Sequence, residues 1–564
     1  MFFKRKSQKI EIELDEIFAD ATNLPDFNTG RLEGRIEEPL SKWNLYGVSV
    51  IFFFIAATFL AQLFSLQVVK GEQYAKQSAT NTLAKNVIFA ERGVVKDRNG
   101  ELLAWNIASE KNAVFSERTY STRRGIGPLV GYVSYPRKDK TGFYYRTEYI
   151  GRGGVEEGLN QALVGENGEQ LMEVNAHGKA VSQHVVHESV PGKEVTLSID
   201  AALSEALYDQ LATTTLTRGY HSGAGAIIDV HTGEIIAMAS YPAFDPNVIV
   251  KGEDANLIES YSKDDKLPFL DKIISGLYTP GSIVKPFLAF AALRDHTIDP
   301  LKTIFSAGKM YVPNPYTPDH PSVFTDWKAN GAMDMRHAIA MSSNIYFYQV
   351  GGGFEGQKGV GIDRMHDFFT YVGLASTTGI ELPGEVSGNV PNPAWKKKVF
   401  NEDWRLGDTY FTSIGQYGFQ VTPLEMLRAY AAIANGGTLL TPTVLKTDRP
   451  IGTTTKLIMP PEHRQIVIEG MRLAAQIGTA KALNKPYMEF AAKSGTAELG
   501  ATKAYVNSWV TGFFPYKKPK YAFIFMMEHG PRANLFGSSP AFGQYIDWIH
   551  TNAPQYLTLE GATE

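Results

Sequence analysis

Residues 277–290 read LYTPGSIVKPFLAF, and this stretch decides how the rest of the chain is interpreted. Pro280 and Gly281 interrupt the preceding structure, so Ser282 is well suited to begin a helix. Lys285 follows three residues later, which places both side chains on one face with Cβ atoms about 5–6 Å apart. A serine hydroxyl is a poor nucleophile until a base takes its proton. Because apolar neighbours disfavour the ammonium form of Lys285, neutral Lys285 could be that base.

The Ser-x-x-Lys spacing alone is a weak signal, because two further copies occur in the chain. Ser260 and Lys263 lie in the charged stretch ESYSKDDK, which we expect to be a loop. Ser306 is followed by Ala-Gly before Lys309. Only Ser282 opens a long apolar helical run, so local structure favours Ser282 as the nucleophile.

Two further motifs follow in a known order and strengthen this interpretation. AMSSNIYFYQV (340–350) supplies Ser342-Ser343-Asn344, and FAAKSGTAEL (490–499) supplies Lys493-Ser494-Gly495-Thr496. Ser-x-x-Lys, Ser-x-Asn and Lys-(Thr/Ser)-Gly occur together, in this order, in one class of serine acyl-transfer enzymes. A second Ser-x-Asn copy (387–389) lies in a Pro/Gly-rich loop, and a second Lys-Thr-Gly copy (140–142) lies upstream of the nucleophile. We therefore predict that 282–285, 342–344 and 493–496 surround one pocket.

An uncharged stretch from Trp43 to Val69 predicts a membrane span. A helix needs roughly 20 apolar residues to cross about 30 Å of hydrocarbon. The alternative is a cleaved signal peptide, which has a shorter apolar region after a short basic head. Because the head here runs to Lys42, we predict an uncleaved single-pass anchor. The basic residues before the span favour a cytoplasmic N-terminus, with residues from 70 onwards outside the cytoplasm.

Composition narrows the remaining possibilities. The chain has 564 residues, of which 44% are hydrophobic and 20% charged, as expected of a globular protein with two or three domains. A formal charge of −4 gives no reason to expect nucleic-acid binding. The absence of cysteine excludes thiolate chemistry, disulfides and cysteine zinc sites.

The pattern of predicted strands and helices changes near residue 201. Before it, 91–106 predicts two strands around an Asn-Gly turn, 150–168 a helix between glycine breaks, and 193–200 a strand. After it, we predict a helix from 201, two buried strands within 223–241, and a hairpin within 507–529. Helices between two sets of antiparallel strands predict an α+β fold.

Together these motifs resemble the class B penicillin-binding proteins, the D,D-transpeptidases of bacterial cell-wall synthesis. The resemblance covers nearly all of 43–556, including ERGVVKDRNGELLAWN, GGVEEGLNQALVGENG, GAGAIIDVHTGEIIAMASYPAFDPN, PGSIVKP, SSN, KSGTAE and the segment 412–437. EVNAHGKAV (173–181) and the segment 392–416 are most similar to the elongation-type group, penicillin-binding protein 2.

The resemblance implies a domain plan. We expect a cytoplasmic tail (1–42), a transmembrane anchor (43–69), an extended β-rich pedestal like the family's dimerisation domain (70–200), a β-lactamase-like transpeptidase domain in which helices cover an antiparallel sheet (201–556), and a C-terminal tail (557–564). The protein would sit in the cytoplasmic (inner) membrane, with its transpeptidase domain periplasmic or extracytoplasmic.

The resemblance also implies roles for the motif residues. Ser282 would attack the carbonyl between the two terminal D-alanines of a peptidoglycan stem peptide, and Lys285 would take its proton. Ser342 would relay a proton to the departing nitrogen, and Asn344 would bind the substrate amide and contact Lys285. Further roles follow for the last motif and for one upstream residue: Lys493 would supply positive charge, Ser494 and Thr496 would hold the terminal carboxylate, Gly495 would leave room for substrate, and Gln416 would line the cleft, a turn role being the alternative. The backbone N–H groups of Ser282 and Thr496 would form the oxyanion hole.

Partners and rival functions follow from the same likeness. An amine of a neighbouring stem peptide would resolve the acyl-enzyme, β-lactams would acylate Ser282, and a membrane glycosyltransferase would supply the polymer. Ile283, Tyr417 and the serine at 494 depart from the usual pattern. Serine at 494 keeps the hydroxyl and therefore the role, whereas Ile283 and Tyr417 leave β-lactam sensitivity open. The alternatives are a division-type transpeptidase, a D,D-carboxypeptidase or β-lactamase-like hydrolase, and a non-catalytic β-lactam sensor.

We expect no cofactor and no metal. One loose cluster could hold zinc, although helical and turn roles explain its members more simply: Asp319, His320, Asp326, Asp334 and His337.

Overall fold

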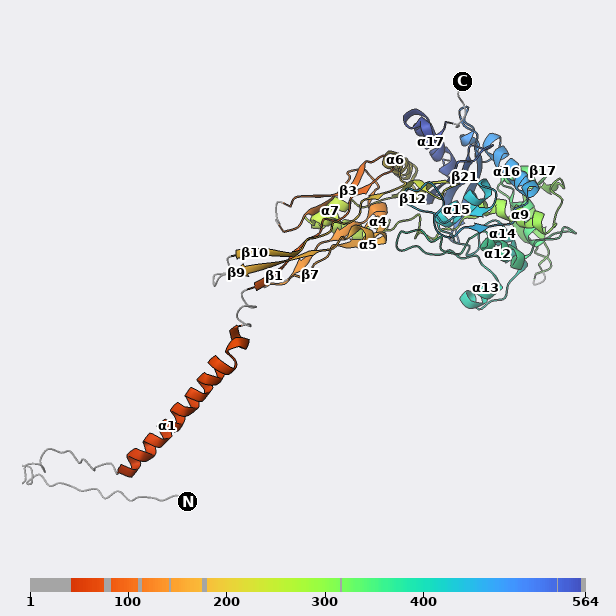
Figure 1. The fold of residues 1–564 in the computed structure, drawn as a ribbon. Coiled ribbons are helices and arrows are strands. Elements are labelled where there is room, and N and C mark those ends of the chain that lie inside the picture. The colour runs from red at the N-terminus through yellow and green to blue at the C-terminus, as the bar shows by residue number, and fades with distance from the viewer. Residues whose placement is uncertain are drawn as a thin grey trace, which may run out of the picture. The chain divides into compact units, whose positions relative to one another are not determined.

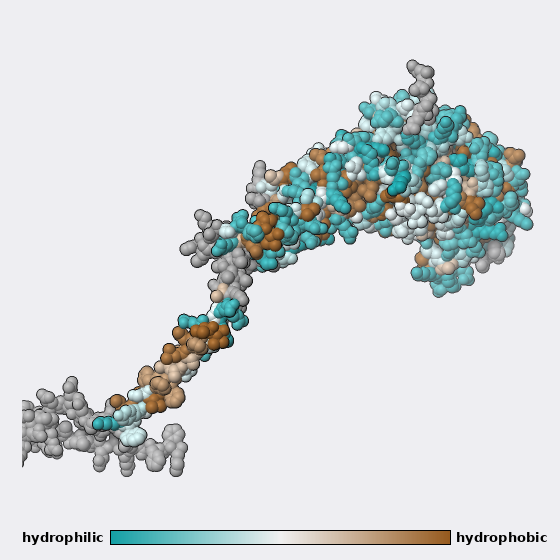
Figure 2. All heavy atoms as spheres, viewed as in Figure 1, coloured by the Kyte–Doolittle hydropathy of each residue, from teal (hydrophilic) through white to brown (hydrophobic). Residues whose placement is uncertain are grey.

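A computed structural model describes residues 42–75, 83–109, 114–140, 144–174, 180–314, 317–534 and 536–558. The chain divides into two compact units, residues 1–84 with 173–182, and residues 85–172 with 183–564. The described part of the first unit contains the helix α1 (Lys42–Phe64), which continues as the π-helical η3 (Ser65–Val69). By length and composition this helix can cross a membrane. Its apolar side chains are exposed along its length (Figure 2), which agrees with the predicted span.

The described residues between Leu83 and Asp200 form short strands and helices. In chain order they are β1 (Leu83–Ile88), β2 (Val95–Lys96), β3 (Leu102–Ile107), β4 (Glu117–Tyr120), α3 (Gly127–Val130), β5 (Tyr132–Ser134), β6 (Arg137–Lys138), β7 (Tyr144–Arg146), β8 (Ile150–Arg152), α4 (Gly154–Gly158), α5 (Asn160–Leu163), β9 (Gly168–Val174), β10 (Ala180–His187) and β11 (Val195–Thr196). The sheets run β1-β9-β10 and β11-β2-β3-β4, with the pairs β5-β8 and β6-β7.

The structure confirms most of the local predictions for this region. β2 and β3 pair antiparallel around the predicted Asn-Gly turn, and the predicted helix within 150–168 is present as α4 and α5. The strand predicted within 193–200 is shorter than expected. Only β11 forms there, because it pairs in parallel with the two-residue β2.

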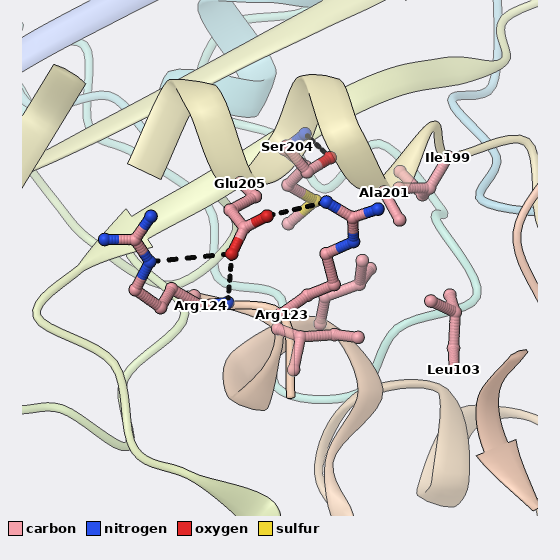
Figure 3. A pocket seen from close by; sticks show the side chains of 11 residues that line it. Leu103, Arg123, Arg124, Ile199, Ala201, Ser204 and Glu205 are labelled. Carbon is pink, nitrogen blue, oxygen red and sulfur yellow. Dashed lines mark hydrogen bonds and ion pairs between the residues drawn. The ribbon is translucent and has the colours of Figure 1, made fainter. Parts of the chain in front are cut away.

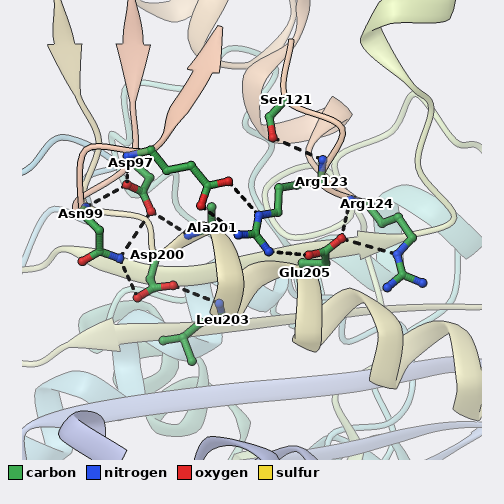
Figure 4. Close-up of polar contacts among 10 residues, drawn as sticks. Asp97, Asn99, Ser121, Arg123, Arg124, Asp200, Ala201, Leu203 and Glu205 are labelled. Carbon is green, nitrogen blue, oxygen red and sulfur yellow. Dashed lines mark hydrogen bonds and ion pairs between the residues drawn. The ribbon is translucent and has the colours of Figure 1, made fainter. Parts of the chain in front are cut away.

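The Asn-Gly turn also binds the start of the next helix, α6 (Ala201–Arg218). One oxygen of Asp97 accepts from the N–H groups of Asn99 and Glu101 at 2.8 Å each, which closes the turn. The other oxygen accepts from the Ala201 N–H at 3.2 Å. Figure 4 shows how Asn99 in turn donates to Asp200, the N-cap of α6.

Ion pairs add a second connection between the β-rich region and α6. Arg123 donates to both oxygens of Glu101 and, at 2.7 Å, to Glu205 on α6, while Arg124 bonds Asp209 one turn later. Figure 3 shows both arginines beside Glu205, at a small pocket that Leu103 and Ile199 also line. Single exposed ion pairs contribute little, but bidentate pairs in a network fix geometry. The network therefore sets where α6 begins relative to β3.

The chain from Ala201 to Thr558 forms one α+β body. After α6 its elements are β12 (Ser222–Asp229), β13 (Ile235–Tyr241), α7 (Pro246–Lys251), α8 (Ala255–Lys263), η4 (Gly281–Val284), α9 (Lys285–Arg294), β14 (Ile304–Ser306), β15 (Lys309–Val312), β16 (Ser322–Thr325), β17 (Gly331–Met333), α10 (Met335–Met341), α11 (Asn344–Gly352), α12 (Ile362–Tyr371), α13 (Pro393–Phe400), α14 (Leu406–Ser413), α15 (Pro423–Ala434), β18 (Thr438–Leu439), β19 (Thr455–Lys456), α16 (Pro461–Gln476), η5 (Lys481–Leu483), β20 (Ala491–Leu499), β21 (Tyr505–Phe514), β22 (Tyr521–Pro531), α17 (Ser538–Asn552) and η6 (Pro554–Tyr556).

A five-stranded antiparallel sheet of order β13-β12-β22-β21-β20 is the centre of this body. Phe523 and Phe525 of β22 belong to the core under α6 and α17, whereas Ile524 and Met526 belong to the core with α9 and α15. Alternate residues of a strand face opposite sides of a sheet. Helices thus cover both faces, with α6 and α17 on one side and α15 on the other (Figure 1). The predicted α+β fold, its two buried strands and its C-terminal hairpin are confirmed.

One local prediction was wrong. Ser260 and Lys263 lie on the helix α8 and not in a loop. Asp254 caps the helix by accepting from the Leu257 N–H at 2.9 Å, and Glu259 pairs with Lys263 at the favourable i,i+4 spacing. The charges that suggested a loop therefore stabilise a helix.

Candidate active site

Ser282 lies in the 3₁₀ turn η4, immediately before the buried helix α9. The turn depends on Gly281, whose φ of 59° is in the left-handed region. A Cβ on Gly281 would lie 2.9 Å from the carbonyl oxygen of Thr496 on β20. The Gly281 N–H also donates to the Gly415 carbonyl at 3.0 Å. The Pro-Gly pair therefore lets the backbone that carries Ser282 pack directly against β20.

Replacing Gly281 by alanine is expected to destabilise the fold by about 1–2 kcal/mol, the usual cost of a left-handed non-glycine residue. The added methyl group must also push η4 away from β20, so the rate of acylation at Ser282 should fall. Thermal unfolding and acylation by a fluorescent penicillin measure the two effects. Gly252→Ala is the matched control, because Gly252 has φ 62° but open space around its Cβ position.

Lys285 connects the first motif to the second. Its Nζ donates to the Ser342 carbonyl at 2.7 Å, to Asn344 Oδ1 at 2.8 Å and to Ser342 Oγ at 3.4 Å. The side chain is fully buried. Burial lowers the pKa of Lys285 to about 7, against the opposing influence of Asp326. A large neutral fraction near neutral pH is what a general base needs.

Ser342 connects the second motif to the third. It ends α10 with φ 57°, an unusual conformation for a residue other than glycine. Its Oγ accepts from Lys493 Nζ at 2.8 Å, in addition to the longer contact with Lys285. One hydroxyl therefore bridges two buried amines, which is suitable for passing a proton between them.

Lys493 is fully buried beside Lys285. Burial, with a further contribution from the neighbouring Lys285, holds the pKa of Lys493 well below its usual range. Its Nζ also donates to the Ser494 carbonyl at 2.7 Å, which fixes the side chain against β20.

The other residues of the third motif follow β20, the edge strand of the sheet. Ser494 Oγ bonds Thr479 Oγ1 at 2.6 Å, and Thr496 is exposed. Gly495 has a reason beyond substrate access, because a Cβ there would lie 2.9 Å from Ile283 Cγ2 and 3.0 Å from the Pro280 carbonyl oxygen. This glycine thus allows β20 to approach the nucleophile turn.

Gln416 lies in the loop after α14 and contacts Glu498, near the end of β20. In the orientation that satisfies both groups, its amide oxygen accepts from the Glu498 N–H at 2.8 Å and its amide nitrogen donates to the Glu498 carbonyl at 3.3 Å. The side chain therefore pairs with the β20 backbone as a neighbouring strand would.

The predicted convergence is observed for Lys285, Ser342, Asn344 and Lys493, which form one hydrogen-bonded group beside the Ser282 turn. Within the described residues the Ser282 hydroxyl has no hydrogen-bond partner, and it is half-buried. Catalytic hydrogen bonds are often long or misaligned until substrate binds. The geometry can thus support a serine nucleophile with a buried lysine base.

The suspected zinc ligands have other roles. Across the part of the chain that the structure describes, no group of three or more His, Cys, Asp or Glu side chains could hold a metal ion. Asp334 caps α10 and also bonds His337 Nδ1 at 2.7 Å. The His320 N–H donates to the Thr317 carbonyl in a turn.

Two neighbours of the site were not predicted as functional. Thr479 bonds Ser494, and Asp326 bonds the Ser343–Asn344 segment. Asp326 was considered only as a metal ligand. No local pattern singles out either residue, because both act through contacts distant in sequence.

Comparison with known proteins agrees with this geometry. The profile of the penicillin-binding protein transpeptidase domain matches residues 223–547, and that of the penicillin-binding protein dimerisation domain matches 111–197. The peptidoglycan D,D-transpeptidase MrdA of Salmonella typhimurium is 31% identical over 487 residues, which span 79% of this chain and 74% of MrdA.

Solved structures show the same fold. Penicillin-binding protein PBP2 of Helicobacter pylori, in complex with MreC, aligns with a TM-score of 0.70 and 25% identity, covering 84% of this chain and 99% of PBP2. A chain of a peptidoglycan synthase complex, described as coordinating polymerization and crosslinking, aligns with a TM-score of 0.70 and 25% identity, covering 92% of this chain and 99% of that chain. With its three motifs assembled and more than half its length matched, this chain belongs to the penicillin-binding protein transpeptidase family.

Proposed function

We infer that this chain is a membrane-anchored peptidoglycan D,D-transpeptidase of the elongation type, which cross-links stem peptides through an acyl-enzyme on Ser282. The observation that supports this most strongly is the hydrogen-bonded path from Lys285 through Ser342 to Lys493 beside the Ser282 turn. The likeness to MrdA supports the reaction and the elongation subtype.

In the first half of the reaction the Ser282 oxygen forms a bond to the carbonyl carbon between the terminal D-alanines. Lys285 accepts the hydroxyl proton. The bond to the terminal D-alanine nitrogen then breaks, and Ser342 passes a proton to that nitrogen. The backbone N–H groups of Ser282 and Thr496 stabilise the developing oxyanion, a contribution worth on the order of 3 kcal/mol per donor.

In the second half an amine of a neighbouring stem peptide attacks the ester carbonyl. A new amide bond forms, the bond to Ser282 breaks, and the hydroxyl regains its proton. β20 is the edge strand of its sheet, and an extended peptide can bind by adding a strand to a sheet edge. Asn344 binds the substrate amide, Gln416 lines the cleft, and Ser494 and Thr496 hold the terminal carboxylate.

The domain plan is part of the proposal. The cytoplasmic tail is 1–42, the anchor 43–69, the pedestal 70–200, the transpeptidase domain 201–556 and the C-terminal tail 557–564. The two family matches, at 111–197 and 223–547, fall inside the proposed pedestal and transpeptidase domain. The basic residues that precede α1 support a cytoplasmic N-terminus and an extracytoplasmic active site.

Two classes of partner follow. β-Lactams resemble the D-Ala-D-Ala end and acylate Ser282. A membrane glycosyltransferase supplies the glycan polymer, in line with the similar chain in a complex that coordinates polymerization and crosslinking.

The product of the reaction tests the proposal. The full chain is incubated with its membrane glycosyltransferase and lipid-linked precursor, and the digested product is separated by chromatography. Cross-linked muropeptide dimers that disappear with penicillin are expected. Trimmed monomers without dimers would instead identify a carboxypeptidase, and unchanged precursor peptides would identify a sensor.

A further inference from the structure

Asp326, in the loop between β16 and β17, accepts an unusual number of hydrogen bonds next to the second motif. Its Oδ1 accepts from the N–H groups of Trp327 and Asn344, both at 2.9 Å. Its Oδ2 accepts from four donors: Ser306 Oγ at 3.0 Å, Asn330 Nδ2 at 3.1 Å, Ser343 Oγ at 2.7 Å and the Ile345 N–H at 3.3 Å.

Six donors exceed the roughly four lone-pair sites of an ionised carboxylate. The group therefore has no capacity left for a metal ion or for transferring a proton. Burial raises the pKa of Asp326, but the bonds from Asn344 and Ser343 and the nearby Lys285 outweigh it and keep the pKa below its usual value. The role left for a saturated, ionised carboxylate is to hold its donors in place.

Those donors are the start of α11. Ser343 is the N-cap of this helix, and Asn344 and Ile345 are its first residues. A negative charge at a helix N-terminus is favourable because the first N–H groups are unpaired. Ser342 precedes this start directly in its left-handed conformation. Holding Ser343 and Asn344 in place therefore also holds Ser342. Ser342 and Asn344 are the two residues that accept hydrogen bonds from Lys285.

Asp326 also contributes a charge. Among the described residues, Asp326, from the β16–β17 loop, is the charged group that raises the pKa of Lys285, and Lys493, from β20, is the other titratable group beside it. α11 presents the neutral Asn344 and the Phe347 ring, whose centroid lies 5.6 Å from Lys285 Nζ. Asp326 is thus the acidic group that offsets the burial of Lys285.

We propose that Asp326 is a positioning residue of the reaction, whose carboxylate holds the Ser342–Asn344 segment against Lys285. This inference rests on the proposed acylation of Ser282. Among the described residues, the hydrogen-bond donors to the Asp326 carboxylate include neither Ser282 nor Lys285 nor Ser342, so Asp326 acts through Ser343, Asn344 and its charge.

The test is the pH profile of acylation by a fluorescent penicillin, measured on the full-length protein in detergent. Asp326→Asn keeps the shape of the side chain but removes its charge and turns a donor towards Ser343. We expect the acylation rate at pH 8 to fall by about 10–100-fold, as for a small displacement of catalytic groups. The acid limb of the profile, where the rate rises with pH as Lys285 becomes neutral, should move to lower pH. Loss of the acidic neighbour lowers the pKa of Lys285, because Asp326 raises it.

Asp334→Asn is the matched control. Asp334 caps the adjacent helix α10 by accepting from the His337 N–H at 2.9 Å, and it contacts none of the motif residues. Its variant should keep both the rate and the acid limb of the wild type. An Asp326→Asn variant with the wild-type rate and limb would overturn the inference, as would a loss of rate with an unmoved limb.

Two further outcomes are decisive. If Asp326→Asn does not fold, Ser343→Ala removes one donor and keeps the charge. It should slow acylation without moving the limb, and an unchanged rate would overturn the inference. Wild-type protein that penicillin never acylates would overturn the proposed acylation of Ser282 by β-lactams, and this inference with it, whereas normal acylation of both proteins would overturn the inference alone.

Discussion

Replacing Lys285 by methionine is expected to slow acylation of Ser282 by about 10²–10⁴-fold, the usual contribution of a positioned general base. Methionine fills similar space but cannot take a proton. The loss should appear in the second-order rate of labelling by a fluorescent penicillin, whereas the thermal unfolding midpoint should change little.

The pH dependence of the wild type gives the same base a second signature. Lysine acts as a base only when neutral, and burial lowers the pKa of Lys285 to about 7. The acylation rate should therefore rise with pH and be half-maximal near that value. A base with an ordinary lysine pKa would instead give a rate that still rises steeply above pH 9.

Lys272 provides the control for Lys285. It is also buried, and burial lowers its pKa to about 8. Its Nζ donates to the Leu267 carbonyl at 3.0 Å, and no motif residue is among its partners. Lys272→Met should keep the wild-type acylation rate and profile. If Lys285→Met and Lys272→Met lose acylation rate equally, the assay detects the loss of a buried lysine and not the loss of a catalytic base.

Replacing Ser342 by glycine is expected to slow acylation by about 10²–10⁴-fold while leaving the fold intact. The hydroxyl that bridges Lys285 and Lys493 is lost. The φ of 57°, however, suits glycine better than serine. The Ser342→Gly variant should therefore lose acylation rate without losing stability. Rates of labelling by a fluorescent penicillin and thermal unfolding measure the two properties.

Asn401→Gly is the control for Ser342. Asn401 has φ 56° at the end of α13 and contacts none of the motif residues. Its variant should unfold at a similar or higher temperature and acylate normally. A Ser342→Gly protein that acylates at the wild-type rate would show that the bridging hydroxyl has no part in the reaction.

The sequence was sufficient where local signals and motif order agreed. The long apolar helix α1, the hairpin of β21 and β22, and the helical turn at Ser282 each have a pattern of apolar residues and turns within a few residues of chain. The convergence of Lys285, Ser342 and Lys493 was predictable because three short motifs occurred in a known order.

The remainder depended on contacts that no local pattern records. The helix around Ser260 was missed because Asp254 capping and the Glu259–Lys263 pair outweigh a high density of charge. The lowered pKa of Lys493 arises from burial and from the approach of Lys285. The hydrogen bonds to Asp326 come from residues up to 20 positions away.

The most direct test of the central claim is to locate the acyl group. The full-length protein is treated with benzylpenicillin, its intact mass is measured, and the modified peptide is mapped. We predict one added penicillin per chain, attached to Ser282 within 277–290 and absent from Ser282→Ala. An adduct on Ser260 or Ser306, or equal labelling of the Ser282→Ala protein, would contradict the assignment.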